Sequence, residues 1–377
     1  MNPSTSHQTS TFSSISSILW DDFDRQTLFH SWLKTVGPDH HLLASSLRTA
    51  SADASFRRYF RIDNSMGQSF IIMDAPPDKE NCQPFALVSN LMSEAGLLVP
   101  EILNWDAAHG FMLLTDLGAK TMMEVINPHM SDALAEPKLD LYLQAIDALI
   151  TWQLASKTDV LPNYDESLLR RELNLYPEWY LAKHKQITLT PSQQATLDQA
   201  FSLIVQRNLA VPFVYVHRDF MPRNLMISER GGKPTMGVLD FQDAVYGPIT
   251  YDIASLMRDA FLSWEEPFVL DVTIRYWEKA VKVGLLGEKS ATGWGADFGE
   301  FYRAVEWQAL QRHLKILGIF ARLTLRDGKP KYLADTTRFI NYVRKTADRY
   351  RDLGPFLKLI DEIEGIETTT GYAFGKV

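Results

Sequence analysis

The sequence predicts an α+β protein with two lobes: a small lobe built on an antiparallel sheet of five strands, and a larger, mostly helical lobe. The chain has 377 residues, which exceeds the usual size of one domain. Strand-like runs separated by turn residues dominate up to Gly118, and amphipathic helical stretches dominate from Thr121 onward. We therefore expect lobes at residues 15–118 and 119–377. Residues 1–14 are rich in Ser and Thr and lack Lys and Arg, which predicts a disordered tail.

The small lobe is expected to contain three strands, an inserted helix and two more strands, after an opening helix. Asp21 or Asp22 can cap that opening helix. Gly96 is placed to end the inserted helix. The predicted helices lie at residues 22–36 and 84–95, and the predicted strands at residues 42–49, 56–63, 69–74, 101–105 and 111–117.

The larger lobe is expected to be helical except around one short apolar run. Residues 213–216 read as a buried strand, and residues 224–228 and 236–239 read as a hairpin closed by a Gly-Gly turn. The predicted helices lie at residues 138–155, 168–184, 192–208, 251–263, 267–283, 297–325 and 332–353.

Three polar residues flank these strands and are expected to point into one cleft: Asp219, Asn224 and Asp240. Phosphoryl transfer asks the protein mainly to position groups and to neutralise charge. Asp219 is the candidate to accept the proton of an attacking hydroxyl. The amide oxygen of Asn224 and the carboxylate of Asp240 are the hard oxygen ligands that suit Mg²⁺. A hairpin whose acids merely face solvent is disfavoured, because the polar positions and the strand pattern agree.

Composition excludes several classes of partner. The chain is 46% hydrophobic and 22% charged, with a net charge of −8, and it contains no Lys/Arg run suited to nucleic acid or to an anionic membrane. It shows no apolar window of about 18 residues that would predict a membrane span, and its first 17 residues match the pattern of neither a secretory signal nor a transit peptide. The single cysteine, Cys82, cannot form an intramolecular disulfide, which is consistent with a reducing cytoplasm. We therefore expect a cytoplasmic protein with small-molecule partners, and the oligomeric state stays open.

The string His-Arg-Asp-x-x-x-x-Asn, followed by Asp-Phe, resembles the catalytic loop and metal motif of protein kinases. Gln242 stands where those kinases have a glycine, and no activation loop follows. The compact form, with a downstream Asp-Ile-Ala, resembles the aminoglycoside phosphotransferase family of small-molecule kinases, which have the protein-kinase fold. This resemblance implies ATP and Mg²⁺ as cofactors. It also implies that Asp252 braces the catalytic loop, and His217 is a further candidate brace.

The motifs SADASFRRYFRI, FIIMDAPP, GFMLLTDLG, HRDFMPRN and QRHLKILGIFARL resemble one branch of that family, the bacterial anomeric sugar kinases. The resemblance implies ATP-dependent phosphorylation of the C1 hydroxyl of N-acetylmuramic acid or N-acetylglucosamine in peptidoglycan recycling. Another small-molecule kinase, including an antibiotic kinase, and a non-catalytic pseudokinase remain alternatives.

Small residues between the first two predicted strands can bring backbone N–H groups close to phosphates, and they include Ser51, Asp53 and Ser55. The resemblance places the ATP phosphates there, and it places the adenine at the backbone around Asp116. The third strand lacks the lysine that protein kinases use for the phosphates. Arg57, Arg58 and Arg61 are the candidate replacements, of which at least one is expected to face the triphosphate; the competing interpretation is that all three are solvated edge charges.

The sugar pocket is the least determined part of the sequence. The stretch LLRRELNLYPEWYL offers Arg171, Glu172 and Trp179 on a predicted helix. Arg171, Arg223 or Arg312 would suit a substrate carboxylate, and Arg223 could instead stabilise the moving phosphoryl group. Each of these residues has an alternative role on a helix surface or in lobe packing.

Overall fold

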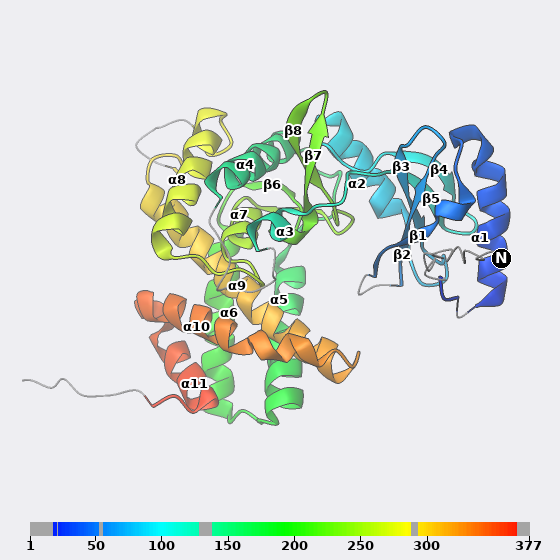
Figure 1. Cartoon of the computed structure of the whole chain (residues 1–377). Helices are drawn as coiled ribbons and strands as arrows, with labels where there is room; N and C mark the ends of the chain where they lie inside the picture. Colours follow the sequence, from blue (N-terminus) through cyan, green and yellow to red (C-terminus); the bar gives the residue numbers. More distant parts are fainter. Residues whose placement is uncertain (1–17, 21, 53–55, 128–137, 288–292, 368–377) are drawn as a thin grey trace, which may run out of the picture. The chain divides into compact units, whose positions relative to one another are not determined.

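The computed structural model describes residues 18–20, 22–52, 56–127, 138–287 and 293–367 (Figure 1). The tail expected at residues 1–14 lies outside these ranges. Two of the phosphate-loop candidates, Asp53 and Ser55, also lie outside them.

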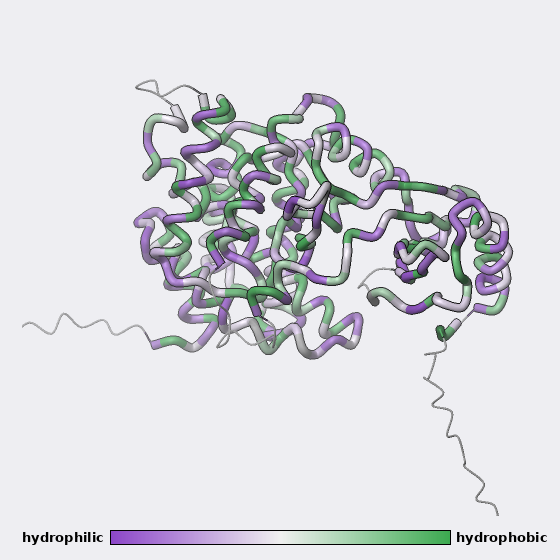
Figure 2. Tube along the Cα trace, turned by 45° about the horizontal axis from the view of Figure 1, so that its top comes forward, coloured by the Kyte–Doolittle hydropathy of each residue, from purple (hydrophilic) through white to green (hydrophobic). Residues whose placement is uncertain are grey.

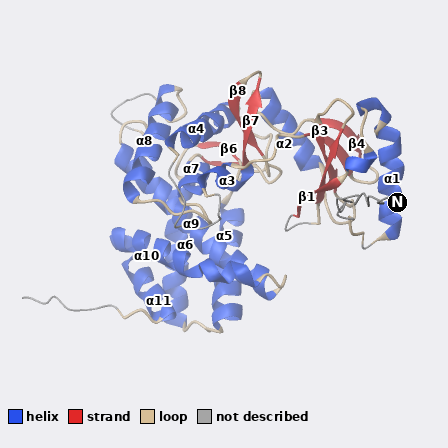
Figure 3. Cartoon of the chain, viewed as in Figure 1, coloured by secondary structure: helices blue, strands red, loops and turns tan. Residues whose placement is uncertain are grey.

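The chain forms two compact units. Unit 1 consists of Met1–Asn90 and Val99–Leu117, and unit 2 consists of Leu91–Leu98 and Gly118–Val377. Strands gather in unit 1 and helices predominate in unit 2, as the predicted α+β class requires (Figure 3). The division between the units falls within helix α2 (Gln83–Glu94).

Unit 1 is built on the predicted antiparallel sheet of five strands, in the order β1-β2-β3-β5-β4. Its strands are β1 (Arg48–Ala52), β2 (Arg58–Asp63), β3 (Ser69–Asp74), β4 (Ile102–Asp106) and β5 (Phe111–Thr115). The turn into β5 depends on Gly110, which has a φ of 72°. A Cβ there would lie 1.9 Å from the carbonyl oxygen of Ala75, so the strands can pair this closely only with glycine.

Helix α1 (Phe23–Val36) covers the sheet of unit 1 with an apolar core. The carboxylate of Asp22 accepts a hydrogen bond from the Arg25 N–H and so caps the helix, as predicted. Phe29 packs edge-on against Phe60 and Phe111, at centroid distances of 5.3 and 5.5 Å. All three rings are buried, and burial of each is worth about 1.5–3 kcal/mol.

The first strand begins later than the apolar pattern predicted. Residues 42–49 were expected to be extended, but Ala44–Ser46 forms a 3-10 turn. The Ser46 hydroxyl donates to the Leu43 carbonyl at 2.6 Å and accepts from the Asp63 N–H at 2.8 Å, and these bonds stabilise the turn. Ser51 consequently lies in β1, opposite Tyr59, rather than in the loop after it.

Unit 2 contains nine named α-helices within the described residues. They are α3 (Met122–Ile126), α4 (Leu139–Leu154), α5 (Glu166–Leu175), α6 (Pro191–Leu209), α7 (Thr250–Met257), α8 (Glu266–Lys282), α9 (Phe298–Leu325), α10 (Thr336–Arg349) and α11 (Gly354–Glu364). Short α3 and α11 escaped prediction, and the last predicted helix is divided, since Pro330–Asp335 is a 3-10 helix before α10.

Two predicted helices end early for identifiable reasons. The helix expected at residues 168–184 continues beyond α5 as a π-helix, Tyr176–Lys185, whose second residue is proline. Proline has no N–H to donate and its ring crowds the preceding turn, which disfavours regular α-helical bonding. Helix α7 stops at Met257, since the Asp259 carboxylate accepts from the Phe261 and Leu262 N–H groups and fixes a turn.

Helix α9 is buried along most of its length and packs against α5, α6, α7, α10 and the π-helix (Figure 1). Gly318 permits this packing. A Cβ at that position would lie 2.3 Å from the Leu175 carbonyl group, where α5 ends. Two polar side chains of α9, Gln311 and Lys315, bond to Glu172 of α5 in this buried environment, and the neighbouring Arg312 is buried as well.

Unit 2 also has two pairs of antiparallel strands. β6 (Phe213–Val216) pairs with β9 (Val245–Pro248), and β7 (Leu225–Arg230) pairs with β8 (Lys233–Val238). The strand at β6 and the hairpin were predicted, whereas β9 was not. Gly231 and Gly232, both with positive φ, close the hairpin.

Hydrophobic and hydrophilic residues alternate in short stretches along the helices (Figure 2). None of the helices that the structure describes is long and apolar enough to cross a membrane.

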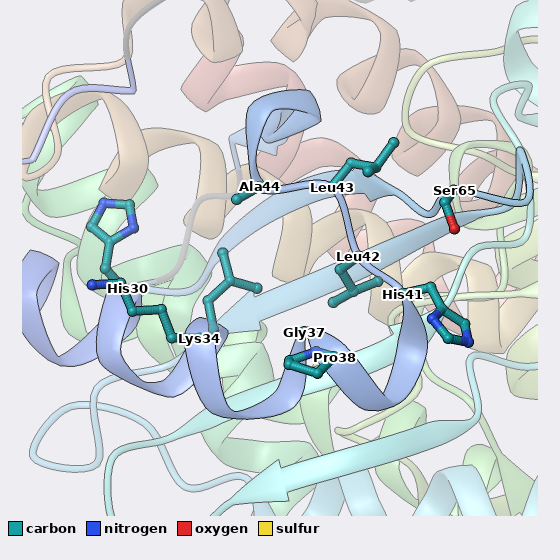
Figure 4. Close-up of a pocket in the computed structure, with 10 residues that line it drawn as sticks. His30, Lys34, Gly37, Pro38, His41, Leu42, Leu43, Ala44 and Ser65 are labelled. Atoms are coloured by element: carbon teal, nitrogen blue, oxygen red, sulfur yellow. The ribbon is translucent and has the colours of Figure 1, made fainter.

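Unit 1 contains a cavity of about 830 Å³ beside α1 (Figure 4). Its lining residues are His30, Leu33, Lys34, Gly37, Pro38, His41, Leu42, Leu43, Ala44 and Ser65. None of them is a predicted site residue and none carries a carboxylate, the side chain that Mg²⁺ prefers, so this cavity does not have the donor set expected for a phosphoryl-transfer site.

Candidate active site

One buried acid binds the backbone of the loop after β6. The carboxylate of Asp252, on α7, accepts hydrogen bonds from the backbone N–H groups of His217, at 2.7 Å, and Arg218, at 3.0 Å. Asp252 is fully buried, and burial raises its pKa, while these two N–H bonds oppose the rise. The arrangement matches the brace that the sequence resemblance implied for Asp252.

His217, the second predicted brace, stabilises the same loop through both nitrogens of its ring. Its Nδ1 accepts the Asp219 backbone N–H at 3.3 Å, so its Nε2 carries the proton and donates to the Leu239 carbonyl at 3.0 Å. Burial lowers the pKa of the imidazole, which favours this neutral form. His217 therefore ties the catalytic loop to the end of β8 and has no nitrogen left for a substrate.

Arg218 adopts a left-handed backbone conformation, with a φ of 77°. Non-glycine residues occupy this region at a cost of order 1–3 kcal/mol, so their surroundings must hold them there. The Arg218 carbonyl accepts from Arg312 Nη1 at 2.7 Å, and its guanidinium donates to Glu172 at 2.5 Å and to the Asp243 carbonyl at 3.3 Å. The bend at Arg218 sets the direction in which the next residue, Asp219, leaves the loop.

The structure brings together Asp219, Asn224 and Asp240, the three residues predicted to share a cleft. The Asn224 side-chain amide donates to the Asp219 carbonyl at 2.9 Å and to Asp240 Oδ2 at 3.2 Å. Gln242, at the position of the kinase glycine, donates to Asp240 Oδ1 at 2.7 Å. The Asp219 carboxylate is half-buried and accepts no hydrogen bond from the described residues, so it is available to a hydroxyl.

The donor set fits a magnesium ion that arrives with a nucleotide. Asn224 and Asp240 supply an amide and a carboxylate side by side, and the described residues contain no cluster of three or more His, Cys, Asp or Glu that could hold a metal alone. Mg²⁺ in phosphoryl-transfer sites is held in this way, by one or two protein oxygens together with phosphates and water.

Arg223 lies one residue before Asn224 and is exposed. Its guanidinium stacks over the Phe261 ring at 3.7 Å. Phe261 belongs to the turn fixed by Asp259, whose carboxylate is buried. The guanidinium is therefore oriented by an aromatic face, and its N–H groups remain directed to solvent or ligand.

The arginines of unit 1 are each paired with an acid. Arg58 and Arg25 each donate two bonds to the buried Asp74, which occupies the end of the strand where a kinase lysine was sought. Arg57 is 8% exposed and pairs with Glu80 at 3.2 Å. None of these arginines is the solvated edge charge of the competing interpretation.

The third candidate arginine, Arg61, also pairs with an acid, as Arg48 does with Asp63. It donates twice to Asp116, which further accepts from Ser69 at 2.5 Å. The carboxylate of Asp116 is thus used inside unit 1, and its backbone is the part suited to a nucleotide. Of the phosphate-loop candidates, Ser51 is the one whose backbone is described, in β1.

The proposed sugar residues separate into two groups. Arg171 is exposed on α5, and Trp179 is half-buried, with the Lys183 ammonium 3.4 Å from its ring centroid. Glu172 and Arg312, by contrast, are buried and bonded to protein partners. The second pair lies beneath the catalytic loop rather than on an open surface.

The sequence profile described as the phosphotransferase enzyme family matches residues 46–288 of this chain. The chain belongs to this family. The candidate site residues Asp219, Asn224 and Asp240 lie within the matched region, and the chain is an enzyme of the ATP-dependent phosphotransferase class.

Two relatives are each 46% identical to the chain in sequence. A protein of Neisseria meningitidis named N-acetylmuramate/N-acetylglucosamine kinase is 46% identical over 351 residues, covering 93% of this chain and 99% of the relative. A Pseudomonas aeruginosa protein of the same name is 46% identical over 316 residues, covering 84% of this chain and 88% of its own.

Solved structures of phosphotransferases confirm the kinase-like fold. A Plasmodium vivax ethanolamine kinase superimposes with a TM-score of 0.58 at 9% identity, covering 88% of this chain and 92% of that one. A putative aminoglycoside phosphotransferase of Ralstonia eutropha gives 0.56 at 12% identity, covering 89% and 98%. At these identities the likeness concerns the fold alone.

Sequence reasoning missed several buried residues that lie next to the candidate site. The partners of Glu172 and the acid that fixes the Arg223 turn were not singled out: Tyr164, Gln311, Lys315 and Asp259. The available signal was the run of four polar residues within Gln311–Lys315, followed directly by the apolar stretch Ile316–Ala321 on the same predicted helix.

Proposed function

We propose that the protein is an ATP-dependent sugar kinase that phosphorylates the anomeric hydroxyl of N-acetylmuramic acid and N-acetylglucosamine, in peptidoglycan recycling. The observation that carries the proposal is 46% identity, over 93% of this chain, to a relative bearing the name of that kinase. The convergence of Asp219, Asn224 and Asp240 independently supports its catalytic part, phosphoryl transfer, because a pseudokinase has no need of such a set.

In the proposed reaction the acceptor hydroxyl lies against the Asp219 carboxylate. Asp219 orients the hydroxyl and takes its proton while the oxygen forms a bond to the γ-phosphorus of ATP and the bond to the β-phosphate oxygen breaks. The products are a sugar 1-phosphate and ADP, and the proton leaves through Asp219. Asn224 and Asp240 hold Mg²⁺, which when bound neutralises phosphate charge. Arg223 neutralises charge on the phosphoryl group or on a substrate carboxylate.

Residues of unit 1 are proposed to bind the nucleotide. The backbone near Asp116 is suited to adenine, and the segment that includes Ser51, Asp53 and Ser55 to phosphates. Arg57 is the favoured replacement for the absent lysine, because it pairs with Glu80 at 3.2 Å, whereas Arg58 shares Asp74 with Arg25 through paired bonds. Glu80 would then hold Arg57 as an acidic partner holds a kinase lysine.

Cellular location and partners are part of the proposal. The net charge of −8 and the absence of a basic run support a cytoplasmic enzyme that meets ATP and a small sugar and binds neither nucleic acid nor a membrane. Arg171 and Trp179 are the remaining candidates for the acceptor pocket.

The test is a coupled kinase assay with N-acetylmuramic acid, N-acetylglucosamine and kanamycin, followed by ³¹P NMR of the product. We expect turnover of the sugars and a phosphorus signal coupled to the anomeric proton. Turnover of kanamycin alone would favour an antibiotic kinase. A signal from phosphate on another carbon would contradict the anomeric assignment, and no turnover of any acceptor would contradict catalysis.

A further inference from the structure

Glu172, on α5, is the centre of a buried polar cluster that the proposed reaction does not use. Its Oε1 accepts from Arg218 Nη2 at 2.5 Å and from Lys315 Nζ at 3.0 Å. Its Oε2 accepts from the Tyr164 hydroxyl at 2.6 Å and from Gln311 Nε2 at 3.0 Å. We call these five residues the Glu172 cluster. Each carboxylate oxygen has two protein donors, and the residue is 4% exposed, so no acceptor site is left for a sugar hydroxyl.

The charges within the Glu172 cluster indicate a structural support for the loop and not a binding pocket. Burial alone would raise the pKa of Glu172, but the charges of Lys315 and Arg218 lower it to about 2. The carboxylate is therefore ionised at every pH at which an enzyme of this class works. Loss of this one negative charge would leave the buried Lys315 and the partly buried Arg218 without their carboxylate partner.

Arg218 connects the cluster to both halves of the reaction centre. Its backbone N–H is bound by Asp252 and its carbonyl by Arg312, while its side chain spans from Glu172 to the Asp243 carbonyl. Asp243 follows the metal ligand Asp240 by three positions, and Asp219 follows Arg218 directly. One guanidinium thus links the loop of the general base to the turn of the metal ligand.

We propose that Glu172 is a positioning residue for phosphoryl transfer: through Arg218 it fixes the left-handed bend before Asp219 and the distance between the base loop and the Asp240 turn. It touches neither the sugar nor the nucleotide. The proposal rests on the proposed function in one respect, that Asp219 acts as the base. Near-attack geometry is sensitive to displacements of about 1 Å, so loss of this support lowers the rate of transfer more than it lowers binding.

If Glu172 only stabilised the fold, its loss would lower stability without lowering the rate of transfer selectively. A matched variant at another buried acid separates these two roles. Asp361 is likewise a buried acid, 3% exposed, paired with Arg344 at 2.5 Å between α10 and α11. Within the described part of the chain, its carboxylate bonds to Arg344 on α10 and to no residue of the loop after β6. Asp361→Asn therefore removes a comparable buried charge from the same unit without disturbing Arg218.

The experiment compares wild type, Glu172→Gln and Asp361→Asn for Tm, kcat, and KM for each sugar and for ATP. We expect both variants to lose Tm, and Glu172→Gln alone to lose kcat, about 30- to 300-fold, with each KM within about threefold of wild type. A kcat within about threefold of the Asp361→Asn value would overturn the proposal. So would a sugar KM raised about tenfold or more at unchanged kcat, because that pattern marks direct binding.

If Glu172→Gln yields no folded protein, the same measurements are made on Arg218→Lys, with Arg344→Lys as the control. The same criteria for kcat and KM then test the positioning role. The lysine keeps the charge but cannot reach Glu172 and the Asp243 carbonyl at once. ATP hydrolysis without a sugar is measured on the same proteins. Should the wild type phosphorylate no sugar, the proposed function fails, while the hydrolysis rates of the variants still test the positioning role.

Discussion

The side-chain nitrogen of Asn224 lies 3.2 Å from Oδ2 of Asp240, although 16 positions separate these residues. The register of the hairpin explains this proximity. Leu225 pairs with Val238, and the Leu239 N–H donates to the Asn224 carbonyl at 2.9 Å, so the residues that flank the two strands emerge together. The proposed metal-ligand pair is therefore a consequence of antiparallel strand pairing.

Asp240→Ala should weaken magnesium-dependent ATP binding and turnover together, because the carboxylate is the one charged ligand of the pair. We expect ATP affinity in the presence of Mg²⁺, measured by calorimetry, to fall about 10- to 100-fold. Glu229→Ala, an exposed acid on the same hairpin, is the control and should leave affinity unchanged. Equal affinities for wild type and Asp240→Ala would remove Asp240 from the metal site.

Arg57→Ala and Arg58→Ala should have different consequences, although the residues are adjacent. Arg57→Ala is expected to weaken ATP binding about tenfold, as loss of a phosphate contact does. Arg58→Ala leaves Asp74 with Arg25 alone and should lower Tm while ATP affinity stays within about threefold. Calorimetric titration and thermal unfolding of both variants check this, and unchanged ATP affinity in Arg57→Ala would show that another group neutralises the triphosphate.

The sequence predicted those structural elements of this phosphotransferase that are determined by residues close together in the chain. Strand β6 and the hairpin follow from short apolar runs and a Gly-Gly turn, and the hairpin register brings Asn224 to Asp240. The cap of α1 at Asp22 likewise follows from residues close in sequence.

The support beneath the catalytic loop could not be predicted in the same way. Glu172 and Lys315 are charged residues on helices, and such residues usually lie on a solvated face. Their burial follows from the close approach of α5 and α9 at Gly318, which is a tertiary event. This is why Glu172 and Arg312 were expected at the sugar and instead lie under the loop.

Asp259→Asn should make stability less dependent on pH between about 4 and 6. Burial raises the pKa of the Asp259 carboxyl to about 6, against about 3.9 in an unfolded chain. In this window the folded wild type binds more protons than the unfolded chain, so its stability falls as pH rises. The asparagine keeps an oxygen for the Phe261 and Leu262 N–H groups but does not ionise.

We therefore expect the free energy of unfolding of Asp259→Asn, relative to wild type, to improve by about 2–3 kcal/mol between pH 4 and pH 7. Urea denaturation of both proteins at the two pH values measures this. A difference between the proteins that is the same at both values would contradict a raised pKa at Asp259.

The central claim is that Asp219 is the group that acts on the acceptor hydroxyl, and Asp219→Asn tests it most directly. The measurement is kcat with N-acetylmuramic acid, together with calorimetric ATP affinity, for this variant and wild type. We predict a kcat lower by about 10²–10⁴-fold with ATP affinity within about threefold, because the amide cannot take the proton and the groups that hold the nucleotide are unchanged. A kcat within about tenfold of wild type would contradict the account.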